Sequence, residues 1–359
     1  MPAAPSPPGR TRVAVVVLTL DAARWLPGCF GSLRAARRAS PEIDLDLIAV
    51  DNGSRDGTAG LLRTGWPEVT VVETGANLGY AGGNDVGLRL ALERGAEFVF
   101  LLNPDTEVDP GFLSEALAVA RARPDAGAIQ SLILLAGERG LVNTSGNEIH
   151  FLGFGWCGAY RSPAAAVPPG PREIAFASGA AVLYRASALR EVGLLDEALF
   201  LYQEDLDLGW RLRLAGHPNL VAPRSVVFHH YEFSRSPRKY YFLERNRWWV
   251  LLKNVRARNL LLLLPFLLAA EAGLHLLAAA SGWLPQKLRA DVDALRPGAL
   301  RRVLSERRRI AALRTVSDRE IFRLFTPAVD FEGAASAWFT RPANALLRAA
   351  WAVLRPLVR

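Results

Sequence analysis

The stretch that decides the fold is LLNPDTEVDP, Leu101 to Pro110. It continues the apolar run EFVFLL and then changes abruptly to an Asn, a Pro and three acidic residues. A short apolar run bounded by turn residues is typical of a buried strand. The end of that strand therefore carries a cluster of side-chain oxygens, and the question is what those oxygens bind.

The same pattern occurs four times between Val13 and Asp109. The runs VAVVVLTL, LDLIAV, VTVVET and EFVFLL each precede a polar or Gly-rich turn and a helical pattern. This alternation predicts an α/β fold with a mostly parallel sheet and helices on both faces. Ligands of such sheets bind beyond the carboxyl ends of the strands. The residues at the four predicted ends are Thr19 and Asp21, Asp51, Asn77, and Asn103 with Asp105.

The alternative for any one of these loops is an ordinary turn. Asp, Asn, Ser and Gly are common turn and helix-capping residues, and Asp56 and Asp109 are expected to be caps. Asp105, after Pro104, also fits a turn. Only the repetition across four loops favours a binding site.

Composition narrows the classes of function. Half of the 359 residues are hydrophobic, which allows a large core, and 43 basic against 35 acidic residues give a net charge of +8. Such a charge suits nucleic acid, an anionic membrane or an anionic substrate. The arginines cluster around a hydrophobic segment and form no recognition module, so nucleic acid is not expected. The start, MPAAPSPPGRTR, lacks the apolar region of a signal peptide, which predicts a flexible tail and a cytoplasmic protein.

The second half of the chain changes character. The segment from Gln130 to Arg172 is rich in Gly and Pro and is expected to be irregular. A helix is predicted from about Gln203 to Ala215, followed by two short strands that end at two histidines. The helix begins with Glu204, Asp205 and Asp207. Neighbouring helical residues point about 100° apart, so these acids cannot all face one pocket, and acids in a first turn are also favoured by the helix dipole alone.

The order of these motifs resembles a known family. VVVLTLDAARWL, AVDNGSRDGT, NLGYAGGNDVG, LLNPDTEVDPGFL, SGAAVLYRASALREVGLLDEALFLYQEDLDLGWRLRLAGH and VVFHHYEFS are similar to the inverting glycosyltransferases of family 2, in the rhamnosyltransferase-like branch. The resemblance covers roughly Val13 to Asn254. It implies a GT-A fold, a nucleotide-diphosphate sugar donor and a divalent metal, Mg²⁺ or Mn²⁺, which would neutralise the leaving diphosphate.

The resemblance also implies roles for individual residues. Asp205 would be the general base, with Glu204 beside it near the acceptor, and Asp105 and His229 would hold the metal. The residues expected to bind the nucleotide sugar are Thr19, Asp21, Asp51, Asn77, Gly79, Asn84 and Asn103. Two positions depart from the family: Asn103 stands where an Asp is usual, and TLD replaces the usual TYN. The glycines of NLGYAGGNDVG could instead serve helix packing, and a histidine at a strand end is often structural.

The segment from Asn259 to Leu284 is the most hydrophobic part of the chain. It approaches the length of one transmembrane helix, but Pro265, Glu271, Gly273 and His275 interrupt it. Basic clusters flank it on both sides, and a single crossing would place one of them against the positive-inside tendency. We therefore expect an interfacial or re-entrant segment at the cytoplasmic face of a membrane, with a buried helix as the alternative.

These expectations define an organisation and a function. Residues 1–12 form a tail, 13–254 a GT-A domain with a nucleotide-sugar half (13–120) and an acceptor half (121–254), 255–285 the interfacial or re-entrant segment, and 286–359 a basic helical region. The expected function is metal-dependent transfer of a sugar, rhamnose being the first candidate, to a polysaccharide or lipid-linked glycan of the cell envelope. The alternatives are a nucleotidyltransferase and a non-catalytic, membrane-bound GT-A binding protein. The sequence leaves the donor sugar, the nucleobase and the oligomeric state open.

Overall fold

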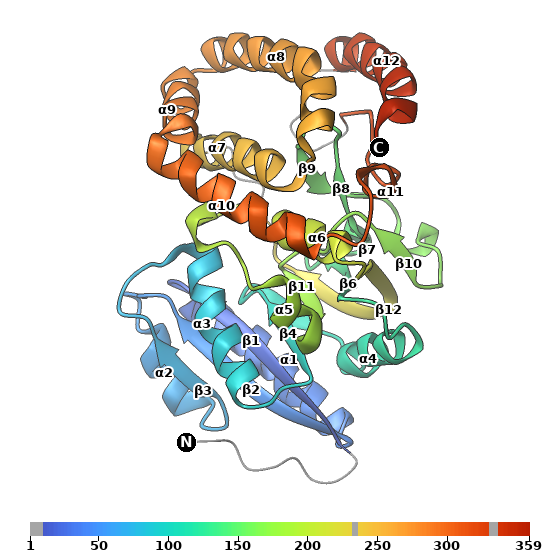
Figure 1. Ribbon diagram of the computed structural model, residues 1–359. Coiled ribbons are helices and arrows are strands. Elements are labelled where there is room, and N and C mark those ends of the chain that lie inside the picture. Colours follow the sequence, from blue (N-terminus) through green and yellow to red (C-terminus); the bar gives the residue numbers. More distant parts are fainter. Residues whose placement is uncertain (1–9, 232–235, 330–336) are drawn as a thin grey trace. The chain divides into compact units, whose positions relative to one another are not determined.

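The computed structural model describes residues 10–231, 236–329 and 337–359 (Figure 1). Most of the predicted tail therefore lies outside the described residues, and the first strand begins at Thr11. The chain forms two compact units. The first unit comprises Met1–Asn147, Cys157–Leu212 and His217–Glu232, and the second comprises Glu148–Trp156, Arg213–Gly216 and Phe233–Arg359.

A ten-stranded sheet is the centre of the first unit, in the order β10-β12-β6-β11-β4-β1-β2-β3, with β5 paired to β12 and β7 paired to β6. Its strands are β1 Thr11–Thr19, β2 Ile43–Asp51, β3 Thr70–Glu73, β4 Phe98–Leu102, β5 Thr106–Val108, β6 Ala128–Leu135, β7 Glu138–Thr144, β10 Arg172–Ile174, β11 Ala181–Arg185 and β12 Asn219–His229. Strands β8 (Asn147–Ile149) and β9 (Gly155–Cys157) form a separate pair.

The sheet is parallel in its first half and mixed in its second. Strand β1 pairs in parallel with β2 and β4, and β2 with β3, as the alternating pattern predicted. Strand β11 then runs antiparallel between β4 and β6. The segment from Gln130 to Arg172 contains β7, β8 and β9 as well as most of β6, so the expectation of an irregular region was wrong. Except for Gly140 in β7 and Gly155 in β9, the Gly and Pro residues there lie outside these short strands, whose pairing is set by distant partners.

Helices cover the sheet. Those of the first unit are η1 Ala23–Trp25, α1 Leu26–Ala39, α2 Thr58–Gly65, α3 Gly79–Glu93, α4 Phe112–Ala122, η2 Ala164–Ala166, α5 Ala186–Val192, η3 Glu197–Leu199 and α6 Glu204–Leu214. The core lies between the strands, which are almost wholly buried from Val13 to Val17, and the apolar faces of α1 and α4. Helix α3 approaches β1 closely, because a Cβ added at Gly87 would lie 2.4 Å from Val16 Cγ1. Part of the Gly-rich motif therefore serves helix packing.

The described part of the second unit is mainly helical (Figure 1). Its helices are α7 Pro237–Asn254, α8 Ala257–Ala280, α9 Leu284–Leu295, α10 Pro297–Leu313, α11 Asp318–Phe322, α12 Ala337–Leu354 and η4 Arg355–Leu357. Helix α7, which the sequence analysis placed in the first domain, groups with the helices that follow it. Helix α8 is long and apolar enough to cross a membrane by length and composition.

Candidate active site

The ends of β1 and β2 bring three of the predicted donor-site residues together. Thr19 and Asp51 are register partners, and the Thr19 hydroxyl donates to Asp51 Oδ1 at 3.3 Å. Asp51 is 3% exposed and also accepts from the amide and the hydroxyl of Ser54. Asp21 lies on the loop after β1, and its Oδ1 accepts from the amide of Arg55, on the loop after β2, at 2.7 Å. Its backbone φ of 48° is in the left-handed region. These carboxylates shape the loop after β2 through hydrogen bonds to it.

The start of α3 is organised by two asparagines. Asn77 Oδ1 accepts from the Gly79 amide at 2.8 Å and from Asn52 Nδ2 at 3.3 Å. Asn52, which the sequence analysis did not select, is 2% exposed and its Oδ1 accepts from the Leu78 amide at 2.9 Å. Asn84 is tied to its own helix, since its Nδ2 donates to the Tyr80 carbonyl at 2.9 Å. Asn77 and Gly79 thus share one hydrogen-bonded turn, whereas Asn84 makes a bond within α3.

The end of β4 meets the end of β12. Asn103 is held by its backbone, with its amide donating to Ala180 O and its carbonyl accepting from Thr106 Oγ1. Asp105 Oδ1 is buried and has no hydrogen-bond partner among the described residues. It lies 3.3 Å from Nε2 of His229, whose Nδ1 is 2.9 Å from Asn143 Oδ1.

This pair of atoms fits a divalent cation. Two ligands at right angles on an ion with bonds of 2.0–2.1 Å are separated by about 3 Å. Asp105 Oδ1 and His229 Nε2, at 3.3 Å, have nearly that spacing, and the carboxylate oxygen lacks any other partner among the described residues. A carboxylate and a neutral imidazole also suit Mn²⁺ chemically. Asp105 and His229 are therefore the residues that could hold a metal.

The two acids expected to serve the acceptor lie at the start of α6. Asp205 accepts from the amides of Gly179, at 3.1 Å, and Leu206, at 2.7 Å. Burial raises the pKa of both Glu204 and Asp205, and the charge of Asp205 raises that of Glu204 further. Glu204 Oε2 is buried with no hydrogen-bond partner in the described part of the chain. Asp207 is different, because it is fully buried and paired with Arg211 at 3.0 Å.

The backbone before these acids is strained. Phe200, Tyr202 and Gln203 have φ values of 63°, 67° and 67°, which non-glycine residues rarely adopt. Strain of this kind concentrates at functional sites. This segment, which precedes α6, contacts the start of α3, where Phe200 O accepts from the Ala81 amide at 3.3 Å.

Tyr80 connects the two halves of the site, and sequence reasoning missed it. Its hydroxyl donates to Gly179 O at 2.8 Å, next to the amide that binds Asp205. Burial raises the pKa of Tyr80 well above its ordinary value, and the charges of Glu204, Asp205 and Asp105 act in the same direction. Tyr80 therefore lies within electrostatic reach of all three acids. Its position inside the Gly-rich motif was the only signal in the sequence.

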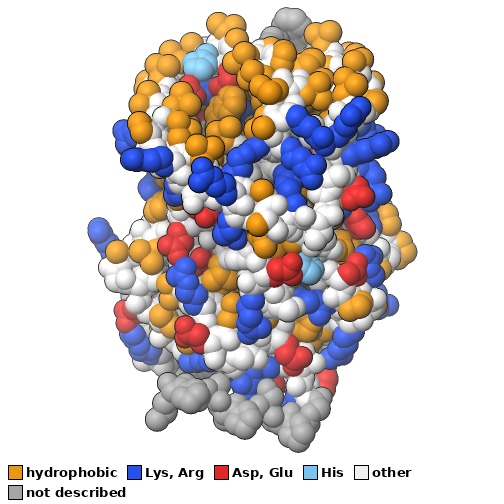
Figure 2. Space-filling view, in the orientation of Figure 1, with side chains coloured by type: hydrophobic (Ala, Val, Ile, Leu, Met, Phe, Trp, Pro, Cys, Tyr) orange, Lys and Arg blue, Asp and Glu red, His pale blue; other side chains and the backbone are white. Residues whose placement is uncertain are grey.

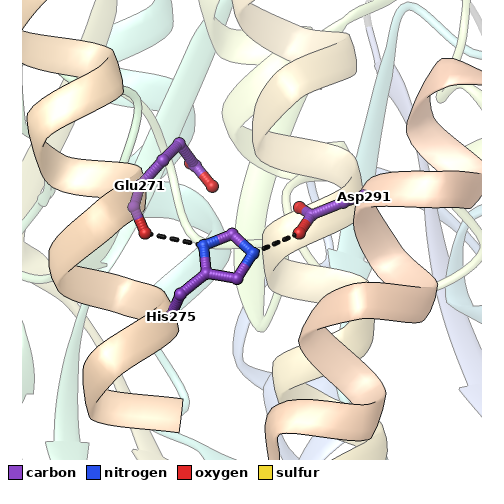
Figure 3. A group of neighbouring side chains, drawn as sticks. All are labelled: Glu271, His275 and Asp291. Carbon is purple, nitrogen blue, oxygen red and sulfur yellow. Dashed lines mark hydrogen bonds and ion pairs between the residues drawn. The ribbon is translucent and has the colours of Figure 1, made fainter. Parts of the chain in front are cut away.

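A second group of ionisable residues lies in the second unit. Atoms of Glu271, His275 and Asp291 that could bind a metal lie within 4.8 Å of one another (Figure 3). Lys287 already supplies a cation there, because its Nζ contacts the carboxylates of Glu271 and Asp291, the latter at 2.8 Å. We therefore assign no metal to this group.

The comparisons with known proteins show the family and the fold. The model of the family described as glycosyl transferase family 2 matches residues 14–193, and the chain belongs to that family. It is a glycosyltransferase with a GT-A fold and resembles the rhamnosyltransferases of the family.

Two curated relatives and two solved structures illustrate the likeness. An N-acetylglucosaminyl-diphospho-decaprenol L-rhamnosyltransferase of Mycobacterium tuberculosis is 32% identical over 239 residues, which are 60% of this chain and 76% of that protein. A low-salt glycan biosynthesis hexosyltransferase of Haloferax volcanii is 28% identical over 47% of this chain and 53% of its own length. A mannosyltransferase of Pyrobaculum calidifontis, solved with GDP-Man and Mn²⁺, is 18% identical with a TM-score of 0.50, covering 99% of this chain and 88% of that one. GalNAc-T7, solved with UDP, GalNAc and Mn²⁺, is 14% identical with a TM-score of 0.54, covering 69% of this chain and 48% of that one.

Proposed function

We propose that this chain is a metal-dependent inverting glycosyltransferase. It moves a sugar, with rhamnose the first candidate, from a nucleotide-diphosphate sugar to a polysaccharide or lipid-linked glycan acceptor during cell-envelope glycan synthesis. The observation that carries the proposal is the position of Asp105 Oδ1 beside His229 Nε2, because this oxygen has no hydrogen-bond partner among the described residues. Tyr80 lies within electrostatic reach of Asp105, Glu204 and Asp205. The name of the mycobacterial relative supports the sugar and the lipid-linked acceptor.

Asp205 is the general base of this proposal. An acceptor hydroxyl has a very high pKa and attacks poorly unless a base removes its proton as the bond forms. Burial raises the pKa of Asp205 and makes it a stronger base than an exposed carboxylate, while two backbone amides hold its orientation. Burial and the charge of Asp205 also raise the pKa of Glu204, which lies beside the base and would contact the acceptor.

The donor would bind at the ends of β1, β2 and β4. Thr19, Asp21, Asp51, Asn77 and Gly79 form the loops there, and we assign them, with Asn84 and Asn103, to the nucleotide sugar. Asp105 and His229 would hold Mg²⁺ or Mn²⁺, which when bound neutralises the charge of the departing nucleoside diphosphate. The side chains of Asn77 and Asn52 accept hydrogen bonds from the backbone amides at the start of α3. Because these bonds already fix the turn before α3, a ligand that binds there need not order it.

We also propose that the protein works at the cytoplasmic face of the cell membrane, as a peripheral or monotopic protein. A lipid-linked acceptor is confined to a membrane, and a net charge of +8 suits an anionic surface.

Product analysis tests the activity. The purified full chain is incubated with nucleotide sugars, Mn²⁺ or Mg²⁺, and an N-acetylglucosaminyl-diphospho-lipid acceptor, the kind that the mycobacterial relative's name gives. Transfer of the sugar with release of a nucleoside diphosphate is the expected result, and Asp205→Asn should slow it about 10²–10⁴-fold. Release of pyrophosphate would instead support a nucleotidyltransferase. Donor binding without transfer under all conditions would support the non-catalytic alternative.

A further inference from the structure

One face of α8 is apolar and exposed. Leu261, Leu268 and Leu276 are 69%, 57% and 73% exposed. They are about two helical turns apart, so they form one stripe along the helix. In Figure 2 hydrophobic side chains gather in the region that α8 and α12 occupy in Figure 1. Apolar surface of this extent on a folded protein marks an interaction site.

The opposite face of α8 is fixed to the helices beside it. Leu263 and Leu267 are buried, and Glu271 bonds to Arg247 of α7 and to Lys287 of α9. The side chains of Arg247 and Lys287 are both 0% exposed. Both also reach Glu244, at 3.1 and 3.0 Å, so the charges are paired inside the second unit.

Two further contacts fix α8 on either side of Glu271. Near its start, Asn259 Nδ2 donates to Asp318 Oδ2 at 2.6 Å. One turn after Glu271, His275 lies between two acceptors, with Nδ1 2.8 Å from the Glu271 carbonyl and Nε2 2.9 Å from Asp291 Oδ2 (Figure 3). Polar contacts therefore hold the helix along most of its length.

These contacts bear on where α8 lies, which the sequence left open between an interfacial or re-entrant segment and a buried helix. A helix that packs as a buried core element would not expose the leucine stripe. A helix that crosses a bilayer would have to leave α7 and α9, and Glu271 would enter the hydrocarbon without its two cations, which is costly. A helix lying along the surface keeps every ion pair and buries only the stripe.

We propose that α8 lies in the plane of an anionic bilayer, with the Leu261–Leu268–Leu276 stripe in the acyl boundary, and does not cross. The proposal rests on the membrane location suggested above. Charge supports a lipid surface as the occupant. Arg289 and Arg296, on and after α9, share one carboxylate partner, Asp293, and their side chains are 75% and 67% exposed, so the group keeps a net positive charge. Basic residues beside an exposed apolar surface are attracted to anionic lipid headgroups.

Vesicle flotation tests the surface. The full chain should float with vesicles of phosphatidylcholine and phosphatidylglycerol and should bind pure phosphatidylcholine at least tenfold less, because the arginines need anionic headgroups. Leu268→Glu should reduce binding at least tenfold. Leu61→Glu is the matched control, because Leu61 is 47% exposed on α2 of the first unit, and it should bind like the wild type. Equal binding by both variants would overturn the proposal.

Depth measurements test the orientation. Single cysteines at Leu261, Leu268 and Leu276, in a Cys157→Ser background, carry nitroxide labels whose depth is read from oxygen and nickel accessibility. An in-plane helix gives one common depth. A crossing helix gives a depth that changes by roughly 10 Å over the seven residues from Leu261 to Leu268, and this result would overturn the proposal.

Two further outcomes are distinguishable. A failure to bind any vesicle, together with a dimer that Leu268→Glu dissociates, would show that a second copy covers the stripe. Donor binding is measured separately, by thermal shift with nucleotide sugars and Mn²⁺, and should be the same in wild type and Leu268→Glu. If donor binding fails in both, the proposed function is contradicted and the vesicle result stands.

Discussion

Asn143 holds the ring of His229, with the amide oxygen of one residue 2.9 Å from Nδ1 of the other. An amide oxygen only accepts hydrogen bonds, so Nδ1 carries the proton and the lone pair of a neutral ring lies on Nε2. Nε2 is the atom beside Asp105. Asn143, 2% exposed on β7, therefore presents His229 in the tautomer that a metal ligand requires.

Asn143→Leu should lower the affinity for Mn²⁺ about 10–100-fold, the usual cost of losing a partner of a metal-binding histidine. Asn143→Asp keeps an acceptor and should retain the affinity. Calorimetric titration with Mn²⁺ measures this effect, and nitrogen NMR shifts of the His229 ring report the tautomer. Thr144→Val is the control, because the Thr144 hydroxyl bonds to Asn147. Unchanged affinity in Asn143→Leu would contradict the role.

Asp205→Asn should reduce kcat about 10²–10⁴-fold, as expected for a general base, while the fold stays intact. Asp207→Asn should instead destabilise the protein by about 3–5 kcal/mol, because it removes the buried partner of Arg211. Because burial raises the pKa of Asp205, activity of the wild type should fall on acidification at a pH above the ordinary carboxyl range. Steady-state kinetics and urea unfolding separate the two variants. Equal loss of stability in both would argue against a specific role for Asp205.

Asp85 on α3 should make the stability depend on pH. Burial raises its pKa to about 7 in the folded protein, although the Leu195 amide and Arg89 act against the shift. The contribution of protonated Asp85 to the free energy of unfolding is fully present below the unfolded pKa near 4. It is lost as the pH rises through 7, by at most about 1.4 kcal/mol per pH unit. Urea unfolding at pH 5 and pH 7.5 measures the loss. Asp85→Asn should remove this loss of stability between the two pH values. The same pH dependence in Asp85→Asn as in the wild type would contradict the role of Asp85.

Gly79→Ala should destabilise the protein by about 2–4 kcal/mol and weaken donor binding. Gly79 has a φ of +78°, and an added Cβ would lie 2.4 Å from Phe200 O, at the segment that precedes Glu204 and Asp205. Gly60→Ala is the control, because an added Cβ there meets nothing within 4 Å. An alanine at this position within α2 should raise the free energy of unfolding by about 0.5–1 kcal/mol. Thermal unfolding with and without a nucleotide sugar tests both. A tolerated alanine at Gly79 would exclude close packing as its role.

Lys287→Met should destabilise the second unit by about 3–5 kcal/mol, because three carboxylates would lose their buried cation. Arg309→Ala breaks a partly exposed pair with Glu306 and should cost less than about 1 kcal/mol. Chemical unfolding followed by tryptophan fluorescence compares the two. A small effect at Lys287 would mean that water already reaches the cluster.

The sequence alone determined the parts of this protein that depend on local pattern. Alternating apolar runs and helical segments specify the parallel half of the sheet, because burial on both faces requires continuous apolar strands. The polar residues after β1, β2 and β4 lie where those strands end, since parallel strands share one edge. The apolar composition of α8 was equally visible, because it depends on neighbouring residues only.

The tertiary structure decided which distant residues meet. Asn143 and His229 are 86 residues apart, Tyr80 and Gly179 are 99 apart, and Arg247 and Glu271 are 24 apart. No local periodicity records such pairs, because they depend on strand register and helix packing, which the whole chain sets together. The sequence thus determined the strands and the acids at their ends. Only the fold decided which ring Asn143 orients, which acids surround Tyr80, and which face of α8 remains exposed.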